Sequence, residues 1–425
     1  MYLLRWDKDM KIKSIKKKIK RIVKKKYIYD GKVLFTVSEI CKMIKIDVPK
    51  KFNKIKNLPL IETKLLNKLE NSKDIYNNFR IKRLFFYKPK EVRKYLRKFR
   101  EKYDTQDCLA KSNVKLIEML IDWYYLSDNY GFNYNDYFDY EIYNKKMIDY
   151  DKFLNSEYRS IVYKICNDKN YTFYFRNKGE FNKKFSKYVN RDWIDGTSCT
   201  RDEFLKFVKK HPRFFSKPIT GTGGYGAGIL KYDGENLDEL LDNVRKNELI
   251  CEEIVKQHKD MAAFCEDTLN TCRLYTLKKK DGDVIVTLAN ARFGRMGNEV
   301  DNFHSGGVSA GIDLETGKLC TDSINRAHLK FKKHPDSGIV FKGYQIPLWD
   351  KAVEAVCEMA KDVPNIRHIG WDVAFTEDGN IELIEGNGWP NFDITQAVDQ
   401  VGKKYRYHEH ILELDEKGVI KEAKI

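Results

Sequence analysis

Apolar and polar residues alternate in several short segments of the C-terminal half of the chain, a pattern that predicts β-strands. The segment GWDVAFTEDGNIELIEGN, residues 370–387, holds two such runs around Asp378-Gly379, a favoured two-residue hairpin turn. Counted outward from that turn, Asp372 lies opposite Glu385, and Asn387 follows on the same face. The other face is apolar and carries Trp371, Val373, Phe375 and Ile384. The hairpin is therefore predicted to belong to a packed sheet with an acidic pair on one face.

This acidic pair requires an explanation. Directly opposed side chains lie about 4.5–5.5 Å apart at Cβ, and like charges at that separation repel. The same count places Phe375 opposite Glu382. Apart from a solvated acidic face, the arrangement suits a cation between Asp372 and Glu385. Two carboxylates and the amide oxygen of Asn387 are ligands that Mg²⁺ prefers.

Apolar residues three and four positions apart predict amphipathic helices in the N-terminal part. In MKIKSIKKKIKRIVKKK, residues 10–26, the apolar positions lie among lysines. Such a helix is typical of segments that bind anionic membranes or nucleic acid, but it is equally expected of a helix that packs its apolar stripe on its own domain. Further helices are predicted at 35–46, 88–103 and 112–128. The aromatic stretch at 130–144 is expected to be buried between helices rather than to stack on bases.

The chain changes character near residue 170. From there onward strands and helices alternate and the glycines concentrate. We therefore divide the sequence into a basic, mainly helical N-terminal domain at 1–110, a helical and aromatic region at 111–170, and a catalytic domain at 171–425.

The composition is that of a folded protein, because 42% of the 425 residues are hydrophobic although 33% are charged. The nine cysteines include no CxxC pair, which favours a reducing compartment. No apolar run approaches the roughly 20 residues of a membrane span, and the N-terminus lacks a signal-peptide core. We expect a soluble cytoplasmic protein.

The net charge of +17 is concentrated in the first quarter of the chain. Residues 1–110 hold 33 Lys/Arg against 12 Asp/Glu, a balance of +21, so the remainder carries −4. This asymmetry predicts a polyanionic partner for residues 1–110, either an anionic membrane surface or a nucleic acid. A membrane partner would make the protein peripheral at the membrane surface.

A glycine-rich loop follows a strand in FFSKPITGTGGYGAGIL, residues 214–230. Lys217 ends the strand and supplies a point charge, and glycines allow backbone N–H groups to approach a phosphate. The glycines are Gly221, Gly223, Gly224, Gly226 and Gly228. The loop is not a Walker loop, because its lysine precedes the glycines and no GK[ST] opens a helix. Such a hairpin can be purely structural, but the lysine favours a phosphate site.

The segment LICEEIVKQH, residues 249–258, predicts a strand that carries Glu252 and Glu253 and continues into Ile254-Val255. An edge of this kind suits an adenine, since backbone groups can read its edge while apolar side chains pack on its face.

The order of these features resembles the ATP-grasp superfamily, and more narrowly the sugar-transfer-associated ATP-grasp proteins. The matching segments are NKGEFNKKF, SKPITGTGG, EEIVKQH, NTCRLYTL, DNFHSGG and GWDVAFTEDGNIELIEGN, within about residues 125–400. The resemblance implies an α+β ATP-grasp fold, in which two α+β subdomains clamp ATP between sheets. Residues 1–110 lie outside it.

The resemblance also implies site residues. The phosphates of ATP would be held by Lys178, Lys217, Gly221, Gly223 and Gly224, with Asn177 standing where the family has Asp. The adenine-binding linker would be Glu252, Glu253, Ile254 and Val255, and Asp260 would contact the ribose. The ligands of two Mg²⁺ ions would be Asp372, Glu385 and Asn387.

Three arginines lie between the linker and the hairpin. Arg273 is in an alternating strand, and Arg292 and Arg295 precede Asn302, in a loop that resembles the Asn-x-x-x-Gly-Gly loop of glutamate-ligase-type members. Arginines here can neutralise transferred phosphoryl and acylphosphate oxygens, although each is also compatible with a surface position. His304 suits a proton acceptor or a structural hydrogen-bonder equally well.

The implied function is ATP-dependent carboxylate–amine ligation through an acylphosphate. The substrates would be a small-molecule carboxylate and an amine such as an amino acid or amino sugar, in polysaccharide biosynthesis. Two alternatives stay open: an ATP-grasp kinase that phosphorylates a sugar or another small-molecule hydroxyl, and a nucleic-acid- or membrane-binding protein with a regulatory ATP-grasp domain.

Overall fold

The computed structural model of the chain describes residues 129–221, 226–297 and 306–422, together with strand residues 26–29 and 32–36 and a few helical positions between 94 and 127. The chain divides into two compact units, Met1–Tyr134 and Asn135–Ile425. This division falls between the predicted boundaries near 110 and 170, which stay predictions.

The first unit contains an antiparallel hairpin that the sequence pattern did not predict, formed by β1 (Lys26–Tyr29) and β2 (Lys32–Thr36). Of the predicted helices at 10–26 and 35–46, only Lys26, Phe35 and Thr36 are described, and these residues belong to β1 and β2, so the helix prediction is wrong there. The other positions of both predicted helices lie outside the described residues. The described positions within the predicted helices 88–103 and 112–128 are helical, and the rings of Tyr95 and Trp123 lie 4.5 Å apart between them.

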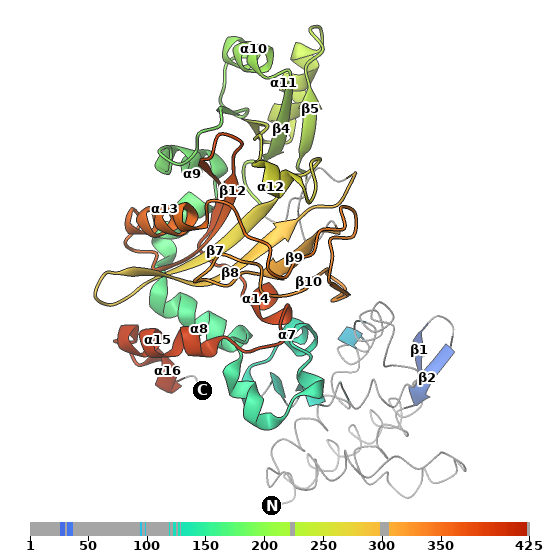
Figure 1. The fold of residues 1–425 in the computed structure, drawn as a ribbon, viewed down its shortest axis with the longest axis vertical. Helices are drawn as coiled ribbons and strands as arrows, with labels where there is room; N and C mark the ends of the chain where they lie inside the picture. Colours follow the sequence, from blue (N-terminus) through green and yellow to red (C-terminus); the bar gives the residue numbers. More distant parts are fainter. Residues whose placement is uncertain are drawn as a thin grey trace, which may run out of the picture. The chain divides into compact units, whose positions relative to one another are not determined.

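The second unit contains a seven-stranded antiparallel sheet, hereafter the large sheet (Figure 1). Its order is β11-β10-β9-β8-β7-β12-β13. The strands are β7 (Thr271–Lys278), β8 (Val284–Phe293), β9 (Val308–Gly311), β10 (Ser323–Ile324), β11 (Lys330–Phe331), β12 (His368–Phe375) and β13 (Ile381–Asn387).

Helices cover both faces of the large sheet, because alternate residues of its strands are apolar on each side. On one face α13 (Trp349–Lys361) packs on side chains such as Leu274 and Trp371. On the other face α8 (Ser156–Cys166) and α15 (His408–Leu414) pack on Tyr275 and Leu277. The remaining helices are α7 (Tyr134–Asp139), α9 (Lys178–Lys184), α12 (Lys259–Ala262), α14 (Asp393–Ala397) and α16 (Val419–Glu422), with 3₁₀ segments η2 (Ile142–Asn144), η3 (Met147–Lys152), η4 (Lys169–Phe175) and η6 (Lys404–Arg406).

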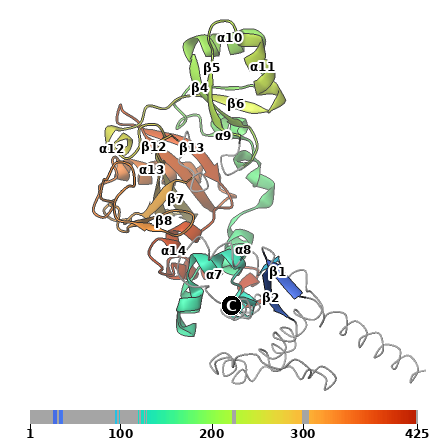
Figure 2. The same cartoon turned by 90° about the vertical axis from the view of Figure 1, so that its right-hand side faces the viewer.

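A second, four-stranded sheet, hereafter the small sheet, has the order β3-β6-β4-β5. Its strands are β3 (Trp193–Asp195), β4 (Arg213–Pro218), β5 (Gly228–Lys231) and β6 (Leu249–Glu253). The helices α10 (Arg201–Lys210) and α11 (Leu237–Lys246) pack on it around Phe204 and Val244 (Figure 2). A capping box between Thr200 and Glu203 begins α10, as expected for a Thr-x-x-Glu sequence.

The hairpin of β12 and β13 follows the expected pairing at one end only. The predicted two-residue turn is wrong: residues 376–380 form a longer loop, in which Gly379 has φ +78°, and Phe375 pairs with Ile381 rather than Glu382. A register shift between Asp372 and Val373 then compensates, and Asp372 pairs with Glu385 as expected. The aromatic stretch is also buried as expected, with Tyr137 and Phe138 each fully enclosed.

Candidate active site

The acidic pair of the hairpin faces two arginines. Arg273, directly across from Asp372 on β7, binds both oxygens of its carboxylate, with Nη2 2.5 Å from Oδ2. Arg292 on β8 adds a contact of 3.1 Å from Nη1 to the same oxygen. Burial alone would raise the pKa of Asp372, but the two guanidinium groups hold it below its usual value. Positive charge beside Asp372 is thus supplied by the protein itself, through Arg273 and Arg292.

Glu385 and Asn387 differ from Asp372 in their partners. Among the described residues, the half-buried Glu385 carboxylate has no ion pair within 4 Å. It acts electrostatically on both Lys178 and Arg273. The side-chain oxygen of Asn387 accepts a hydrogen bond of 2.8 Å from the backbone N–H of Trp389. The donor set of two carboxylates and an amide oxygen fits a hard divalent cation such as Mg²⁺.

Lys178 is the first residue of α9, and Asn177 is its N-cap, with its side-chain oxygen accepting from the backbone N–H of Glu180 at 3.0 Å. Asn caps a helix about as well as Asp, so the departure from the family pattern at this position has a local explanation. The Lys178 ammonium donates to the carbonyl of Gly221 at 3.1 Å. Burial lowers the pKa of Lys178, with Glu385 raising it, Lys217 lowering it and Glu252 raising it to smaller extents. Lys178 therefore lies between the acids of the large sheet and the lysine of the small sheet.

Lys217 is buried in β4 and forms an ion pair of 2.8 Å with Glu252 on the neighbouring strand β6. The carboxylate of Glu252 thus points into the protein, although its backbone belongs to the predicted adenine linker. Glu253 accepts a hydrogen bond of 3.0 Å from the backbone N–H of Asp192, and Ile254 and Val255 are partly exposed. An apolar surface is consequently available where the adenine was expected.

Arg191 connects the two sheets, and sequence reasoning missed it. Its guanidinium lies 2.8 Å from Glu252 Oε1 and 2.5 Å from Glu382 Oε1, and all three side chains are at most 4% exposed. Asn182 adds a hydrogen bond of 3.3 Å to Glu252. Burial would raise the pKa of Glu252, but Arg191 and Lys217 lower it to about 2. The only sequence signal was Glu382, an acidic residue between the apolar Ile381 and Leu383.

The other predicted residues are not all brought to this place. Arg295 pairs with Asp336 through two contacts of 2.8 and 2.9 Å, so its charge is already compensated there. Asp260 lies in α12 with its carboxylate 3.6 Å from His258. Gly221 has φ +113°, which favours glycine. Gly223, Gly224 and Asn302 lie outside the described residues, as does His304.

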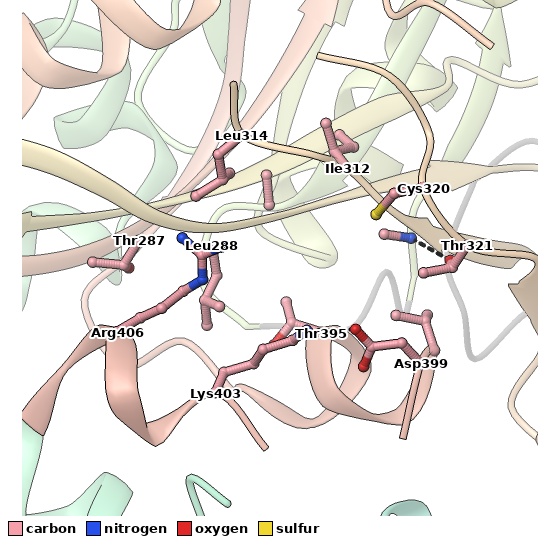
Figure 3. Close-up of a pocket in the computed structure, with 13 residues that line it drawn as sticks. Thr287, Leu288, Ile312, Leu314, Cys320, Thr321, Thr395, Asp399, Lys403 and Arg406 are labelled. Carbon is pink, nitrogen blue, oxygen red and sulfur yellow. Dashed lines mark hydrogen bonds and ion pairs between the residues drawn. The ribbon is translucent and has the colours of Figure 1, made fainter. Parts of the chain in front are cut away.

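A small pocket of about 40 Å³ lies elsewhere, between β8, β9 and α14 (Figure 3). Lys403, Arg406 and Asp399 border its polar side, and Leu288 and Ile312 its apolar side. None of the predicted site residues lines it, and it is far smaller than the roughly 300–1,000 Å³ of small-molecule sites. In the part of the chain that the structure describes, no helix is both long and apolar enough to cross a bilayer.

Comparison with known families agrees with the sequence resemblance. A family model described as sugar-transfer associated ATP-grasp matches residues 130–411. This match confirms the expected α+β ATP-grasp fold. A comparison with curated protein sequences finds no match.

Several solved structures are similar at low identity. The ATP-grasp ligase PsnB complexed with a minimal precursor is 13% identical, with a TM-score of 0.35 over 58% of this chain and 62% of that one. N5-carboxyaminoimidazole ribonucleotide synthetase from Thermotoga maritima is 11% identical, with a TM-score of 0.32 over 52% and 44%. The biotin carboxylase domain of 2-oxoglutarate carboxylase from Hydrogenobacter thermophilus is 15% identical, with a TM-score of 0.35 over 60% and 51%. The chain thus spans less than two thirds of each of these proteins.

Proposed function

This chain belongs to the sugar-transfer associated ATP-grasp family, and we propose that it is an ATP- and Mg²⁺-dependent carboxylate–amine ligase. It would join a small-molecule carboxylate to an amine, an amino acid or amino sugar, and release ADP and phosphate. The family description supports a role in the biosynthesis of polysaccharides.

The observation that carries the proposal is the pairing of Asp372 with Glu385 on the hairpin, beside Arg273 and Arg292. Asp372, Glu385 and Asn387 would hold Mg²⁺, which supplies positive charge to the phosphates of bound ATP. Arg273 and Arg292 lie within hydrogen-bond distance of Asp372, so their guanidinium groups border the place where phosphoryl transfer would occur.

The residues of the small sheet and α9 would bind the nucleotide. Lys178 and Lys217 supply ammonium groups for the phosphates, and the backbone of 252–255 supplies donors and acceptors for the adenine. For Asp372 to hold Mg²⁺, at least part of its carboxylate would have to be released from Arg273 and Arg292. These arginines then become available for the transferred phosphoryl group, whose negative charge they stabilise.

The proposed reaction has two steps. A carboxylate oxygen of the substrate attacks the γ-phosphorus, and the bond from this phosphorus to the β-phosphate oxygen breaks, which releases ADP. The amine nitrogen then attacks the acyl carbon, phosphate leaves, and the amine gives up a proton. No cysteine or serine of the chain is needed as a covalent nucleophile.

The experiment that tests the proposal is incubation of the full chain with Mg-ATP and pools of carboxylates, amino acids and amino sugars. We expect ADP rather than AMP, and with hydroxylamine in place of the amine we expect a hydroxamate, because hydroxylamine attacks acylphosphates. An ADP-forming reaction that yields a phosphorylated sugar and no hydroxamate would replace the ligase by the kinase.

We also propose that residues 1–110, with their balance of +21, bind a polyanionic surface. Such binding weakens with salt, because each phosphate contact releases counterions. Co-sedimentation with phosphatidylserine vesicles, compared with retention on nucleic acid, separates a membrane-peripheral protein from a nucleic-acid-binding one.

A further inference from the structure

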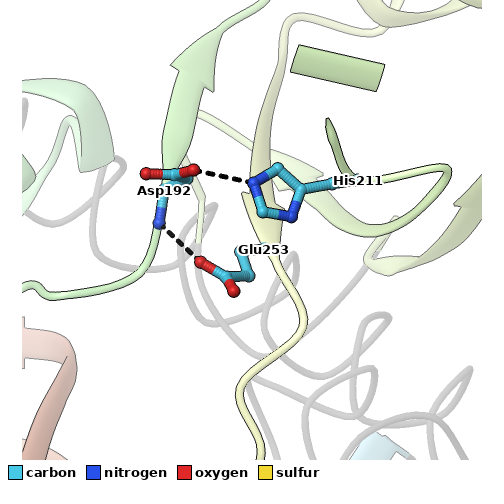
Figure 4. Close-up of side chains that lie close together, drawn as sticks. All are labelled: Asp192, His211 and Glu253. Atoms are coloured by element: carbon cyan, nitrogen blue, oxygen red, sulfur yellow. Dashed lines mark hydrogen bonds and ion pairs between the residues drawn. The ribbon is translucent and has the colours of Figure 1, made fainter. Parts of the chain in front are cut away.

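Asp192, His211 and Glu253 come together at one end of the small sheet (Figure 4). Asp192 immediately precedes β3, His211 is the C-cap of α10, and Glu253 is the last residue of β6. His211 Nε2 lies 2.8 Å from Asp192 Oδ2, and one candidate ligand atom from each residue lies within 4.8 Å of the other two. Three chain segments that are distant in sequence thus present one imidazole and two carboxylates to the same place.

The two carboxylates are held close by strand pairing. Trp193 pairs with Glu252, so Asp192 and Glu253 are the next opposed residues, and the backbone N–H of Glu253 donates to the carbonyl of Asp192 at 2.8 Å. Opposed acids repel and need a cation. In this structure Lys210 pairs with Asp192 beside His211. Because the Lys210 side chain is 68% exposed, it can swing into solvent and be replaced.

We propose that Asp192, His211 and Glu253 form a binding site for a divalent cation of the zinc class, distinct from the acidic pair Asp372 and Glu385. Imidazole nitrogen and carboxylate oxygen are zinc ligands at about 2.0–2.2 Å, and three protein ligands leave a fourth position for water. In a tetrahedral site, ligand atoms at that radius lie about 3.4 Å apart, so the atoms of this cluster, all within 4.8 Å of one another, would have to approach by about 1 Å, which side-chain rotation can supply. Mg²⁺ prefers all-oxygen octahedral sites and is not expected to compete.

This site goes beyond the proposed function, and its test does not depend on ligase activity. The cation would join the start of β3 to the end of β6, where Glu253 continues into Ile254 and Val255 of the predicted adenine linker. Its binding should therefore stabilise the small sheet, and the melting temperature should rise with zinc concentration, as for any ligand of the native state.

The test uses the full chain, treated with chelator, freed of it, and held in excess Mg²⁺ to occupy oxygen-rich sites. Titration with ZnCl₂ by calorimetry and elemental analysis should give one bound zinc for this site. His211→Gln and Asp192→Asn should each lower the zinc affinity by about tenfold or more. Losing a residue that only supports a ligand already costs about that much, and each of these variants removes a ligand itself. Glutamine keeps a donor for Asp192, so circular dichroism should show His211→Gln folded, and the same measurement checks Asp192→Asn.

His258→Gln is the matched control, because His258 lies 3.6 Å from a single carboxylate, Asp260, and belongs to no three-residue cluster among the described side chains. Its zinc affinity should equal that of the unmodified chain. The proposal is overturned if no stoichiometric zinc binds. It is also overturned if zinc binds equally to the His211 and Asp192 variants, which would mean an adventitious ion only, held by cysteines or other surface groups.

Discussion

Replacing Arg191 by methionine tests the link between the two sheets most directly. The guanidinium is the shared partner of Glu252 and Glu382, and its removal leaves two buried carboxylates. Breaking a buried ion pair in this way costs about 3–5 kcal/mol. Glu252 keeps Lys217 at 2.8 Å, and Glu382 keeps the backbone N–H of Asn190 at 3.0 Å. We therefore expect the lower end, a loss of about 3 kcal/mol in the free energy of unfolding.

For a unit of this size such a loss lowers the melting temperature by about 5–10 °C. The measurement is urea unfolding followed by tryptophan fluorescence, together with thermal melts. Arg201→Met is the matched control, because Arg201 makes a bidentate pair with Asp238, at 2.6 and 3.1 Å, in which both side chains are more than half exposed. Exposed pairs contribute about 0–1 kcal/mol, so this control should change stability little.

Arg191→Met should also change how the stability of the protein depends on pH. The pKa of Glu252 is about 2 in the folded protein against an ordinary value of 4.5. A depressed carboxyl pKa contributes stability above the unfolded value, and this contribution is lost as the pH falls from 4.5 toward 2. Arg191→Met removes the larger cause of the depression, so the stability difference between the two proteins should shrink over that range. Equal losses in Arg191→Met and Arg201→Met, or a pH-independent difference, would refute the buried network.

Three further outcomes are expected. Glu385→Gln should abolish turnover in Mg-ATP assays while the melting temperature stays within a few degrees, since Glu385 has no ion pair among the described residues; wild-type ADP production would contradict its role at the metal. Lys217→Ala should weaken ATP binding in calorimetry, and unchanged affinity would mean that the loop after it is structural. Burial lowers the pKa of His368 from 6.5 to about 4, so folding disfavours protonation of its imidazole. The free energy of unfolding should therefore fall as the pH drops from 6.5 toward 4. His368→Phe should flatten that slope in urea titrations, and an unchanged slope would place the titration elsewhere.

The acidic pair could be predicted because Asp372 and Glu385 are close in sequence and lie in one alternating hairpin. Even so, the prediction reached the right pair through a register that is wrong near the turn. Residues 376–380 form a longer loop, with Thr376 N–H bonded to Asn380 O at 3.0 Å, and the shift at Val373 restores the pairing. Neither deviation has a signal in the pattern of apolar and polar residues, since both depend on hydrogen bonds within the turn and on packing of the strand.

The partners of these acids could not be predicted, because they come from distant segments. Arg273 is 99 residues before Asp372, and Arg191 is 191 residues before Glu382. Which arginine meets which carboxylate depends on the order of strands, with β7 beside β12 and the residues before β3 beside β13. The sequence indicated a need for positive charge but not its source. Arg295 is only three residues after Arg292, yet it pairs with Asp336 rather than with Asp372.

Several charged residues of the candidate site already have partners within the protein, and this affects how nucleotide and metal would bind. Lys217 holds Glu252, Lys178 donates to Gly221, and Asp372 is held by Arg273 and Arg292. Buried charges left without partners would cost several kcal/mol each, so these pairs keep the site folded without a ligand. Under the proposed function, the nucleotide phosphates would pair with these lysines and arginines, and the carboxylate of Asp372 would then be free to hold Mg²⁺. Affinity is then a difference between two sets of buried ion pairs, which are screened by salt much less than exposed ones. Salt should therefore weaken polyanion binding by residues 1–110 far more than nucleotide binding at this site.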